Sequence, residues 1–306
     1  MLDPAGLKLR ATLFRLTRSF FHDQGFLEVD TPLLQPVFIP ESTIIPFEVE
    51  NLYLQTSPEL CMKRLLAAGC TRLFQICHCF RREETGRLHQ EEFTMLEWYR
   101  TDSDYSDLMT DCEELLRYLV HNMESVGQNC AGVYPQQLFS GIALNSSWRR
   151  ISVAEAFDFF SPIPLVQALE EGQFDRVLVE FIEPHLGFGE PVFLYDYPVE
   201  LASLAKCRND DPETAERFEL YINGVELANG FSELTNSVEQ RARFVEEIRT
   251  MEKECRISVR MPDRFLDDLQ HLDCAAGIAL GFDRLFMLLM GYNSLAEAVT
   301  FHSGDY

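Results

Sequence analysis

Hydrophobic positions along the chain recur at two spacings, and each spacing predicts one type of element. Helices are expected where apolar residues recur every three or four positions, at 7–21, 60–66 and 103–126, and in the charged segment 237–256. The first helical pattern ends near Gly25 and the second begins at Pro58, and both residue types are common at helix ends. Strands are expected in the short apolar segments 26–32, 73–80, 92–100 and 275–282, the last of which runs into a helix at 283–290.

Two more strands meet at a strong turn signal. Asn223-Gly224 separates the segments 217–222 and 225–234, and this dipeptide favours a two-residue hairpin. Strands joined by hairpins, with helices between them, predict an α+β fold with an antiparallel sheet and not a doubly wound one. We expect a single domain over 1–306 with a helical insertion at about 103–190, in which 127–147 forms a loop.

Composition narrows the classes of partner. The 306 residues include 26 basic and 49 acidic side chains, which gives a net charge of −23. Because binding to a phosphate backbone depends on Lys and Arg, this balance disfavours a general nucleic-acid binder. Residues 101–200 carry 17 acidic and 4 basic side chains, whereas residues 1–100 carry 13 and 11, so an anionic ligand is expected in the first third. No apolar run approaches the roughly 20 residues of a membrane span and no secretory signal is present, so we expect a cytoplasmic protein.

An arginine-rich loop between two of the strands suggests a nucleotide site. If the strand at 73–80 continues into FRREETGRLHQEEF, Arg81 and Glu83 lie two positions apart and face the same side. The loop then returns through His89 to Phe93. An arginine fork can hold a phosphate, an acid can accept a hydrogen bond from the adenine amino group, and an aromatic ring can stack on the base. A solvated hairpin with Arg–Glu ion pairs is the alternative and explains these residues equally well.

The second hairpin carries residues that suit a metal site and a pocket wall. Glu219 and Glu226 flank its turn, and Mg²⁺ prefers one or two carboxylates together with phosphate oxygens. The alternative is an acidic strand edge that discourages aggregation. Glu226, Asn229, Phe231 and Glu233 crowd one short strand, which makes it a weak packing element and a reasonable pocket wall.

Five segments, in this order, resemble one family. They are GFLEVDTP, TSPELCMKRLL, FQICHCFRREETGRLHQEEFTMLEWYR, RFELYINGVELANGFSEL and GIALGFDRLFML. Together they resemble the catalytic core of the class II aminoacyl-tRNA synthetases, and within that group lysyl-tRNA synthetase and its short paralogues, the elongation factor P lysine ligases. The resemblance covers nearly the whole chain. It implies an antiparallel sheet flanked by helices and a homodimer formed through the first segment.

The resemblance also implies roles for individual residues. Those implied for ATP are Arg81, Glu83, His89, Gln90, Phe93, Glu226 and Arg284, with Arg81 and Arg284 as the catalytic pair on the phosphates. Those implied around the amino-acid substrate are Ser57, Glu59, Glu97, Tyr99, Asn229, Phe231, Glu233 and Ala279. Those implied for Mg²⁺ are Glu219 and Glu226. The family's usual HNPEF is HQEEF here, so Gln90 replaces an Asn and Glu91 adds a negative charge near the triphosphate.

The reaction implied by the resemblance is attack of an amino-acid carboxylate on the α-phosphate of ATP, which gives an aminoacyl adenylate and pyrophosphate. Only residues 1–24 precede the first matching segment, too few for an anticodon-binding domain, so no tRNA partner is expected. The short paralogues transfer (R)-β-lysine to a lysine ε-amino group of elongation factor P, and the resemblance implies the same acceptor here.

Two residues favour the ligases over the synthetases. Ser57 and Ala279 are ligase-like, whereas the synthetases commonly have Ala and Gly there. Because one methyl group changes discrimination by only about 1–3 kcal/mol, α-lysine is expected to be a weaker substrate and not an excluded one. Two alternatives remain: a stand-alone paralogue that activates lysine or another amino acid for a different acceptor, and a non-catalytic regulatory paralogue. The presence of Arg81, Glu83, Glu219, Glu226 and Arg284 disfavours the second.

Overall fold

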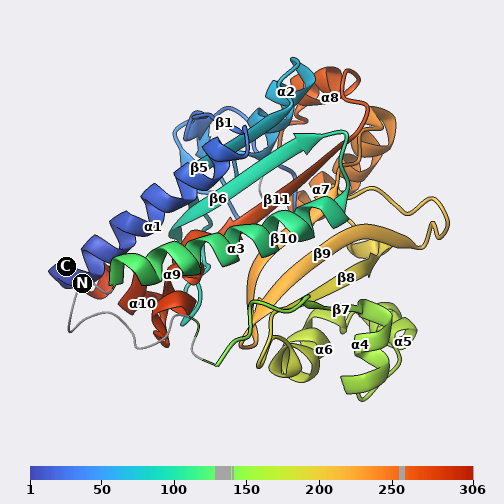
Figure 1. The fold of residues 1–306 in the computed structure, drawn as a ribbon. Coiled ribbons are helices and arrows are strands. Elements are labelled where there is room, and N and C mark those ends of the chain that lie inside the picture. The colour runs from blue at the N-terminus through green and yellow to red at the C-terminus, as the bar shows by residue number, and fades with distance from the viewer. Residues whose placement is uncertain (128–138, 140, 255–258, 306) are drawn as a thin grey trace.

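Eight strands form one sheet in the order β1-β5-β6-β11-β10-β9-β8-β7 (Figure 1). The computed structural model describes residues 1–127, 139, 141–254 and 259–305. The strands are β1 (Leu27–Glu28), β5 (Arg72–Phe80), β6 (Glu92–Thr101), β7 (Arg149–Ser152), β8 (Val192–Pro198), β9 (Thr214–Ile222), β10 (Val225–Ser232) and β11 (Ala275–Gly281). Every neighbouring pair is antiparallel except β1–β5 and β7–β8. The predicted α+β class with a mostly antiparallel sheet is confirmed.

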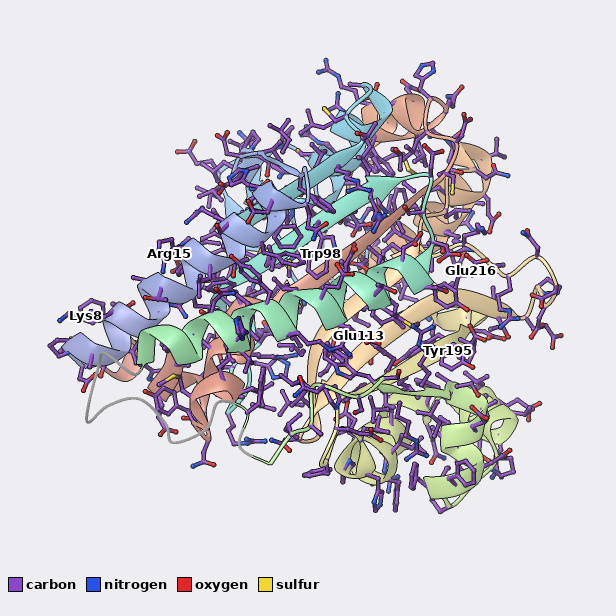
Figure 2. The ribbon with its side chains drawn as sticks, in the orientation of Figure 1. Lys8, Arg15, Trp98, Glu113, Tyr195 and Glu216 are labelled. Carbon is purple, nitrogen blue, oxygen red and sulfur yellow. The ribbon has the colours of Figure 1, made fainter. Side chains whose placement is uncertain are left out.

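Helices cover both faces of this sheet. Since successive residues of a strand point to opposite faces, neighbouring residues of one strand contact different helices. α1 (Pro4–Asp23), α3 (Tyr105–Gly127) and α9 (Phe282–Met290) share a hydrophobic cluster with Trp98 and Ala276. α2 (Glu59–Ala67), α7 (Ser237–Glu254) and α8 (Asp263–Leu269) share another cluster with Tyr99 and Ala275, which are the neighbours of those two residues. Trp98, labelled in Figure 2, also donates its Nε1 hydrogen to Asp111 of α3 at 3.2 Å.

The first helix is attached to the start of α9 by a buried ion pair. Asp3 caps α1, since its Oδ1 accepts a hydrogen bond from the main-chain N of Gly6 at 2.7 Å. Arg10 of α1 places Nη2 2.5 Å from Oδ1 of Asp283, and Oδ2 of Asp283 accepts from the main-chain N of Thr94 at 2.7 Å. Asp283 is therefore fixed from two sides, by α1 and by β6.

The predicted hairpin is confirmed, but one predicted strand is shorter than expected. β9 and β10 meet at Asn223 and Gly224, which have φ values of 51° and 70°, as a tight hairpin turn requires. The strand expected over 26–32 is wrong in length, since β1 pairs with β5 only through Leu27 and Glu28. After Val29, whose N–H still bonds to β5, the chain leaves the edge of the sheet.

A small sheet and a helical cluster extend the fold. β2 (Leu34–Gln35), β4 (Leu52–Leu54) and β3 (Glu48–Val49) form a separate three-stranded sheet. The helical elements α4 (Val153–Phe160), α5 (Leu165–Glu170), α6 (Phe174–Val177), η1 (Leu178–Ile182) and η2 (Glu183–His185) surround a core of their own that reaches β8 and β9. The remaining elements are η3 (Val199–Leu201), α10 (Leu295–Ala298) and η4 (Ser303–Asp305).

The segment 103–190 contains two different parts. α3 packs beside α1 in the main core, whereas α4 to η2 pack around the smaller core at the other side of the sheet. The single domain with a helical insertion at 103–190 stays a prediction. The loop expected at 127–147 and the end of the helix expected over 237–256 fall partly outside the described residues.

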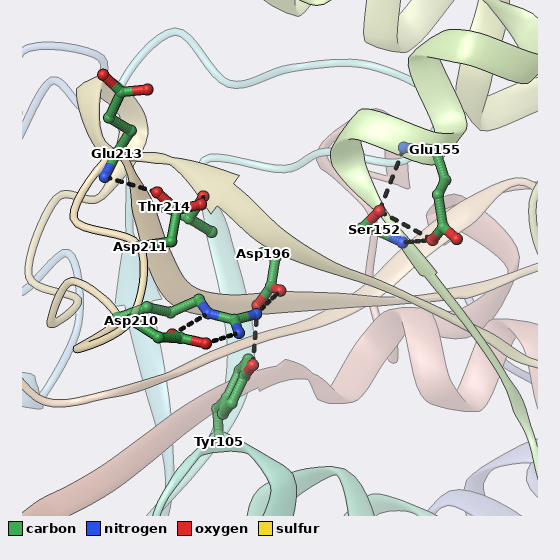
Figure 3. A network of polar contacts seen from close by, with 9 residues as sticks. Tyr105, Ser152, Glu155, Asp196, Asp210, Asp211, Glu213 and Thr214 are labelled. Carbon is green, nitrogen blue, oxygen red and sulfur yellow. Dashed lines mark hydrogen bonds and ion pairs between the residues drawn. The ribbon is translucent and has the colours of Figure 1, made fainter.

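A polar network holds the segment that follows β8 (Figure 3). β8 bulges at Asp196, which has a φ of 59°. Oδ1 of Asp196 accepts from Tyr105 Oη at 2.8 Å, and Arg208 contacts both Asp196 and Asp210. The N-terminus of α3 is thereby joined to the segment 199–213, in which Ser203 faces the cavity described next.

Candidate active site

A cavity of about 510 Å³ lies on the sheet face that α1 and α3 leave free. Strand register places its chemistry there, because cross-strand neighbours share a face. Two adjacent rows of residues run across β6, β11, β10 and β9, in that order of strands. The first row is Glu97, Ala279, Asn229 and Glu219. The second row is Tyr99, Gly277, Phe231 and Arg217. Most members of these rows line the cavity, together with α2, the loop 81–90 and the start of α9.

One end of the cavity is lined by carboxylates. Glu97 is 1% exposed, and its two oxygens accept hydrogen bonds from Ser57 Oγ at 2.6 Å and from Tyr99 Oη at 2.8 Å. Burial, and then the charge of Glu59, raises the pKa of Glu97 from 4.5 to about 7. No cationic side chain of the described residues pairs with Glu97, so this carboxylate suits an ammonium group of a ligand.

A buried lysine, which was not expected, lies behind this end. Lys63 of α2 is 2% exposed, and its Nζ contacts the carboxylates of both Glu59 and Glu233. Burial lowers the pKa of Lys63, but the charges of Glu233 and Glu59 outweigh it, so the pKa is raised and the amine stays protonated. The sequence shows Lys63 only as a polar position of a helix, and the one local signal is Glu59 a turn earlier.

Glu233 does not line the cavity. Its carboxylate is buried against Lys63, and a Cβ atom built on Gly277 would meet its Oε1 at 2.5 Å. Burial raises the pKa of Glu233 to about 8, and the opposing charge of Lys63 does not cancel this effect. Glu233 therefore contacts the cavity only through its neighbours.

Two arginines give the cavity a basic wall as well. Arg81 directly follows β5, and its guanidinium lies 5.3 Å from the centre of the Phe93 ring. Arg284, in the first turn of α9, donates Nη1 to the main-chain O of Glu226 at 2.8 Å and places Nη2 2.8 Å from Nε2 of His89. Burial, and then the charge of Arg284, lowers the pKa of His89, so its neutral ring accepts from Arg284. Two guanidinium groups and an aromatic ring thus share one wall.

Glu83 lies outside the cavity, and the expectation that it faces the same side as Arg81 is wrong. β5 ends at Phe80, and Glu83 has a φ of 70°, which directs its Oε1 to 3.2 Å from Nη2 of Arg82. Glu84 lines the cavity instead, with its Oε1 3.8 Å from Nη1 of Arg81.

Gln90 also lines the cavity. Its Nε2 is buried and has no hydrogen-bond partner within the described part of the chain. An unpaired buried donor is costly, and a ligand acceptor atom would satisfy it. The Gln that replaces the family's Asn thus keeps a polar group in the site.

The two carboxylates expected to hold Mg²⁺ have different surroundings. Glu219 is buried and accepts from Arg217 Nη2 and from Tyr221 Oη, each at 2.7 Å, whereas Glu226 lines the cavity 3.4 Å from Nη1 of Arg284. Burial, and then the charge of Glu226, raises the pKa of Glu219, so the two carboxylates repel each other. Among the described residues no group of three or more His, Cys, Asp or Glu is placed to hold a metal. Mg²⁺ fits the pair nevertheless, since it completes its shell with phosphate oxygens and water.

Comparison with known proteins decides the family. The family described as tRNA synthetases class II (D, K and N) matches residues 4–303. The elongation factor P–(R)-β-lysine ligase of Salmonella gallinarum is 39% identical over 307 residues, which cover 95% of this chain and 93% of that protein. Its counterpart from Salmonella dublin is 38% identical over 303 residues, with the same two shares. The chain belongs to the class II (D, K and N) tRNA synthetase family.

Within the class II synthetase family, the chain groups with the elongation factor P β-lysine ligases. This result confirms the resemblance and the prediction that the protein is a ligase. The family implies the use of ATP. In the described part of the chain, no helix has the length and apolarity to span a membrane.

The cavity of this class II protein collects most of the residues assigned from sequence. Those that line it are Ser57, Glu59, Arg81, His89, Gln90, Phe93, Glu97, Tyr99, Glu226, Asn229, Phe231, Ala279 and Arg284. Glu83, Glu219 and Glu233 do not line it. Glu41, Glu84 and Arg217 line it without having been expected. For Arg217 the sequence held a usable signal, because it lies two positions before Glu219 on the same strand face.

The pKa values of Glu97 and Glu233 predict opposite effects of pH on substrate affinity and on stability. Glu97 must ionise to match an ammonium group of the substrate, so the KM for a diamino acid should fall as the pH rises from 6 to 8.5 through its pKa of about 7. In the ligand-free folded protein, the carboxyls of Glu97 and Glu233 keep their protons up to pKa values of about 7 and about 8, whereas in the unfolded chain they lose them near pH 4.5. The free energy of unfolding should therefore decrease as the pH rises from 6 to 8.5.

Two measurements check this prediction. ATP–pyrophosphate exchange with lysine gives the KM at each pH, and thermal unfolding without ligand gives the midpoint temperature. A KM that is constant between pH 6 and 8.5, or a midpoint that rises over this interval, contradicts the prediction.

Proposed function

We propose that this protein activates (R)-β-lysine with ATP as an aminoacyl adenylate and transfers it to the ε-amino group of a lysine of elongation factor P. The supporting observation is one cavity with a carboxylate end at Glu97 and Glu59 and a guanidinium end at Arg81 and Arg284. A diamino acid presents ammonium groups to the first end and its carboxylate to the second. Relatives named elongation factor P–(R)-β-lysine ligase, 38–39% identical, support the same substrate and acceptor.

Adenylate formation needs positioning and charge stabilisation, and no covalent catalyst. The substrate carboxylate attacks the α-phosphorus of ATP, a P–O bond forms, the bond to the bridging oxygen breaks, and pyrophosphate leaves. Negative charge on the phosphate oxygens is stabilised by Arg81 and Arg284 at the basic end. Glu97, held by Ser57 and Tyr99, orients the substrate by its ammonium group.

Transfer to the protein acceptor follows on the same adenylate. The neutral ε-amine of the acceptor lysine attacks the adenylate carbonyl, a C–N bond forms, the C–O bond to AMP breaks, and the amine loses one proton. The net charge of −23 supports a protein acceptor over tRNA, because tRNA binding depends on basic side chains.

Mg²⁺ is the metal that the site suits. Glu226 at the cavity surface and Glu219 behind it would hold the ion. When bound, it supplies positive charge to the phosphate oxygens of ATP and relieves the repulsion between the two carboxylates. Arg217, which pairs with Glu219, opposes the effect of burial by lowering the pKa of that carboxyl.

Ala279 supports the preference for β-lysine over α-lysine. Its register partners are Glu97 on β6 and Asn229 on β10, so its methyl group lies in the row that receives the substrate's amino groups. Replacing Ala279 by Gly should narrow the preference by about 10-fold or more, since a single methyl group changes discrimination by about 1–3 kcal/mol. Exchange kinetics with both lysines give the ratio of kcat/KM values. An unchanged ratio, or equal rates with both lysines in the parent protein, contradicts this part of the proposal.

A homodimer is also part of the proposal. Large apolar side chains are exposed on and around β1 to β4, namely Leu27, Leu33, Leu34, Val49 and Leu52. Exposed apolar side chains in such numbers are typical of association sites, and a second copy of this chain is the proposed partner. Sedimentation equilibrium measures the mass in solution, and a 35.3 kDa species at all concentrations contradicts the dimer.

Mass spectrometry tests the whole proposal. Elongation factor P, incubated with the protein, ATP and (R)-β-lysine, should gain the mass of one β-lysyl group on a lysine. Exchange activity with lysine but no modified elongation factor P would favour a different acceptor. Exchange only with an acidic or amide amino acid, or with no amino acid, contradicts the substrate.

A further inference from the structure

Three hydrogen bonds hold the guanidinium group of Arg217 in one orientation. Arg217 lies on β9 and lines the cavity, although most of its side chain is buried. Nε donates to Oδ1 of Asn229 at 3.2 Å, Nη1 to the main-chain O of Leu201 at 2.6 Å, and Nη2 to Oε1 of Glu219 at 2.7 Å. The group also lies over the ring of Tyr197, with Cζ 4.4 Å from the ring centre. It therefore has little freedom to turn.

The bond from Arg217 decides which way the amide of Asn229 faces. An arginine N–H can only donate, so the amide turns its oxygen towards Nε and carries its NH2 group on the other side. In the part of the chain that the structure describes, this NH2 group donates to no other residue. Because Asn229 lines the cavity, two N–H donors are left for a bound ligand.

These donors suit one group of the proposed substrate. A diamino acid carries two ammonium groups, which can only donate, and a carboxylate, which can only accept. Asn229 can therefore bind the carboxylate, with one carboxylate oxygen accepting from the amide while the other attacks the α-phosphorus. If the amide were turned round, its oxygen would face the cavity and repel the carboxylate. A simple diamine has the same ammonium groups, so the carboxylate is what distinguishes the substrate from it.

We propose that Arg217 is a specificity-determining residue that acts through Asn229. This inference rests on the proposed activation of a diamino acid. Arg217 keeps the NH2 group of Asn229 turned to the cavity, so the site favours a diamino acid over a diamine that lacks the carboxylate. The hydrogen bonds of Arg217 are made within the protein, so it is a positioning residue.

Binding of two ligands to Arg217→Met tests this role. The ligands are (R)-β-lysine and the matching enantiomer of pentane-1,4-diamine, which is (R)-β-lysine without its carboxylate. Calorimetric titration without ATP and Mg²⁺ gives both Kd values and separates the effect from any change in metal binding at Glu219. The Kd of (R)-β-lysine should rise about 10-fold or more, as expected for a lost hydrogen bond to a charged group, and the Kd of the diamine should stay near the parent value. Where binding requires ATP, the KM for (R)-β-lysine and the inhibition constant of the diamine in exchange give the same comparison.

Arg243→Met is the matched control for the loss of a guanidinium group. Arg243 is buried to a similar degree and also holds the segment that contains Leu201, since Nη1 donates to the main-chain O of Ser203 and of Ala205, each at 2.9 Å. It does not line the cavity. Arg243→Met should therefore leave both Kd values unchanged.

Two further variants complete the design. Asn229→Ala removes the residue through which Arg217 acts, so Arg217→Met should raise the Kd of (R)-β-lysine little further in that background. If Arg217→Met does not fold, because it leaves the buried carboxylate of Glu219 without a cation, Arg217→Lys replaces it. Lysine keeps a positive charge beside Glu219 but lacks the planar guanidinium group, so Arg217→Lys should show the same selective loss of affinity for (R)-β-lysine.

The outcomes separate this inference from the proposed function. A folded Arg217 variant with the parent Kd for (R)-β-lysine overturns the role of Arg217. Equal losses for both ligands assign Arg217 to the stability of the site alone and also overturn it. A loss that is equally large in the Asn229→Ala background means that Arg217 binds the substrate directly and overturns the action through Asn229. A parent protein that exchanges with (R)-β-lysine but binds the diamine equally well overturns this inference alone. A parent protein that neither binds nor activates a diamino acid contradicts the proposed function, and this inference with it.

Discussion

Replacing Arg284 by Ala should lower the rate of lysine-dependent ATP–pyrophosphate exchange by about 10³-fold, the loss expected when one preorganised donor at a developing charge is removed. Its guanidinium is held by the main-chain O of Glu226 and by His89, so it enters the reaction already oriented. A lysine at this position keeps the positive charge but lacks the planar guanidinium group, which can donate two parallel hydrogen bonds. Arg284→Lys should therefore recover only part of the rate. Steady-state exchange kinetics measure both variants.

Arg87 provides the matched control for this prediction. It lies in the same loop as His89, but it is exposed, donates to the main-chain O of Asn293 at 2.9 Å and does not line the cavity. Arg87→Ala should retain most of the parent rate. A folded Arg284→Ala protein that keeps more than a tenth of the rate would remove Arg284 from the reaction centre.

Replacing Gly277 by Ala should nearly abolish lysine activation. A Cβ atom at this position would lie 2.1 Å from the Tyr99 ring and 2.5 Å from Oε1 of Glu233. Both neighbours belong to the carboxylate end, so Tyr99 must shift and its hydrogen bond to Glu97 is lost. Overpacking of a buried strand should also lower the free energy of unfolding by about 1–3 kcal/mol. Exchange assays and chemical denaturation measure the two effects.

Gly86 gives a comparable substitution without a clash. A Cβ atom at Gly86 would meet no heavy atom within 4 Å, and its φ is not in the left-handed region. Gly86→Ala should therefore change neither stability nor lysine activation by much. If Gly277→Ala matches Gly86→Ala in both assays, the close packing of Tyr99 against β11 is not required for activity.

Much of the fold was predictable because its signals are local. Asn223-Gly224 predicts the hairpin without reference to the rest of the chain. Strand alternation places Glu97 and Tyr99 on one face of β6, and tertiary structure then brings them beside Ala279 and Gly277. The length of β1 was not predictable, because it depends on where the chain leaves the edge of β5, which happens after Val29, and the alternation in residues 26–32 does not show this point.

The errors at the site concern residues whose environment is set by distant partners. Lys63 and Glu233 are 170 positions apart, and nothing near either residue predicts that they form a buried ion pair. Glu83 and Glu84 differ in sequence by one position only, and the backbone conformation at Glu83 decides which of them reaches the cavity. Side-chain direction after the end of a strand is a property of the loop and not of the strand pattern.

The ion pair between Arg10 and Asp283 makes the site depend on two segments that are synthesised far apart in time. Asp283 precedes Arg284 in α9, and its partner is near the opposite terminus, on α1. Until residue 284 has left the ribosome, α1 of the nascent chain lacks this ion pair. Enzymatic competence should therefore appear only after α9 has emerged, and chains that stop before Asp283 should be inert towards ATP.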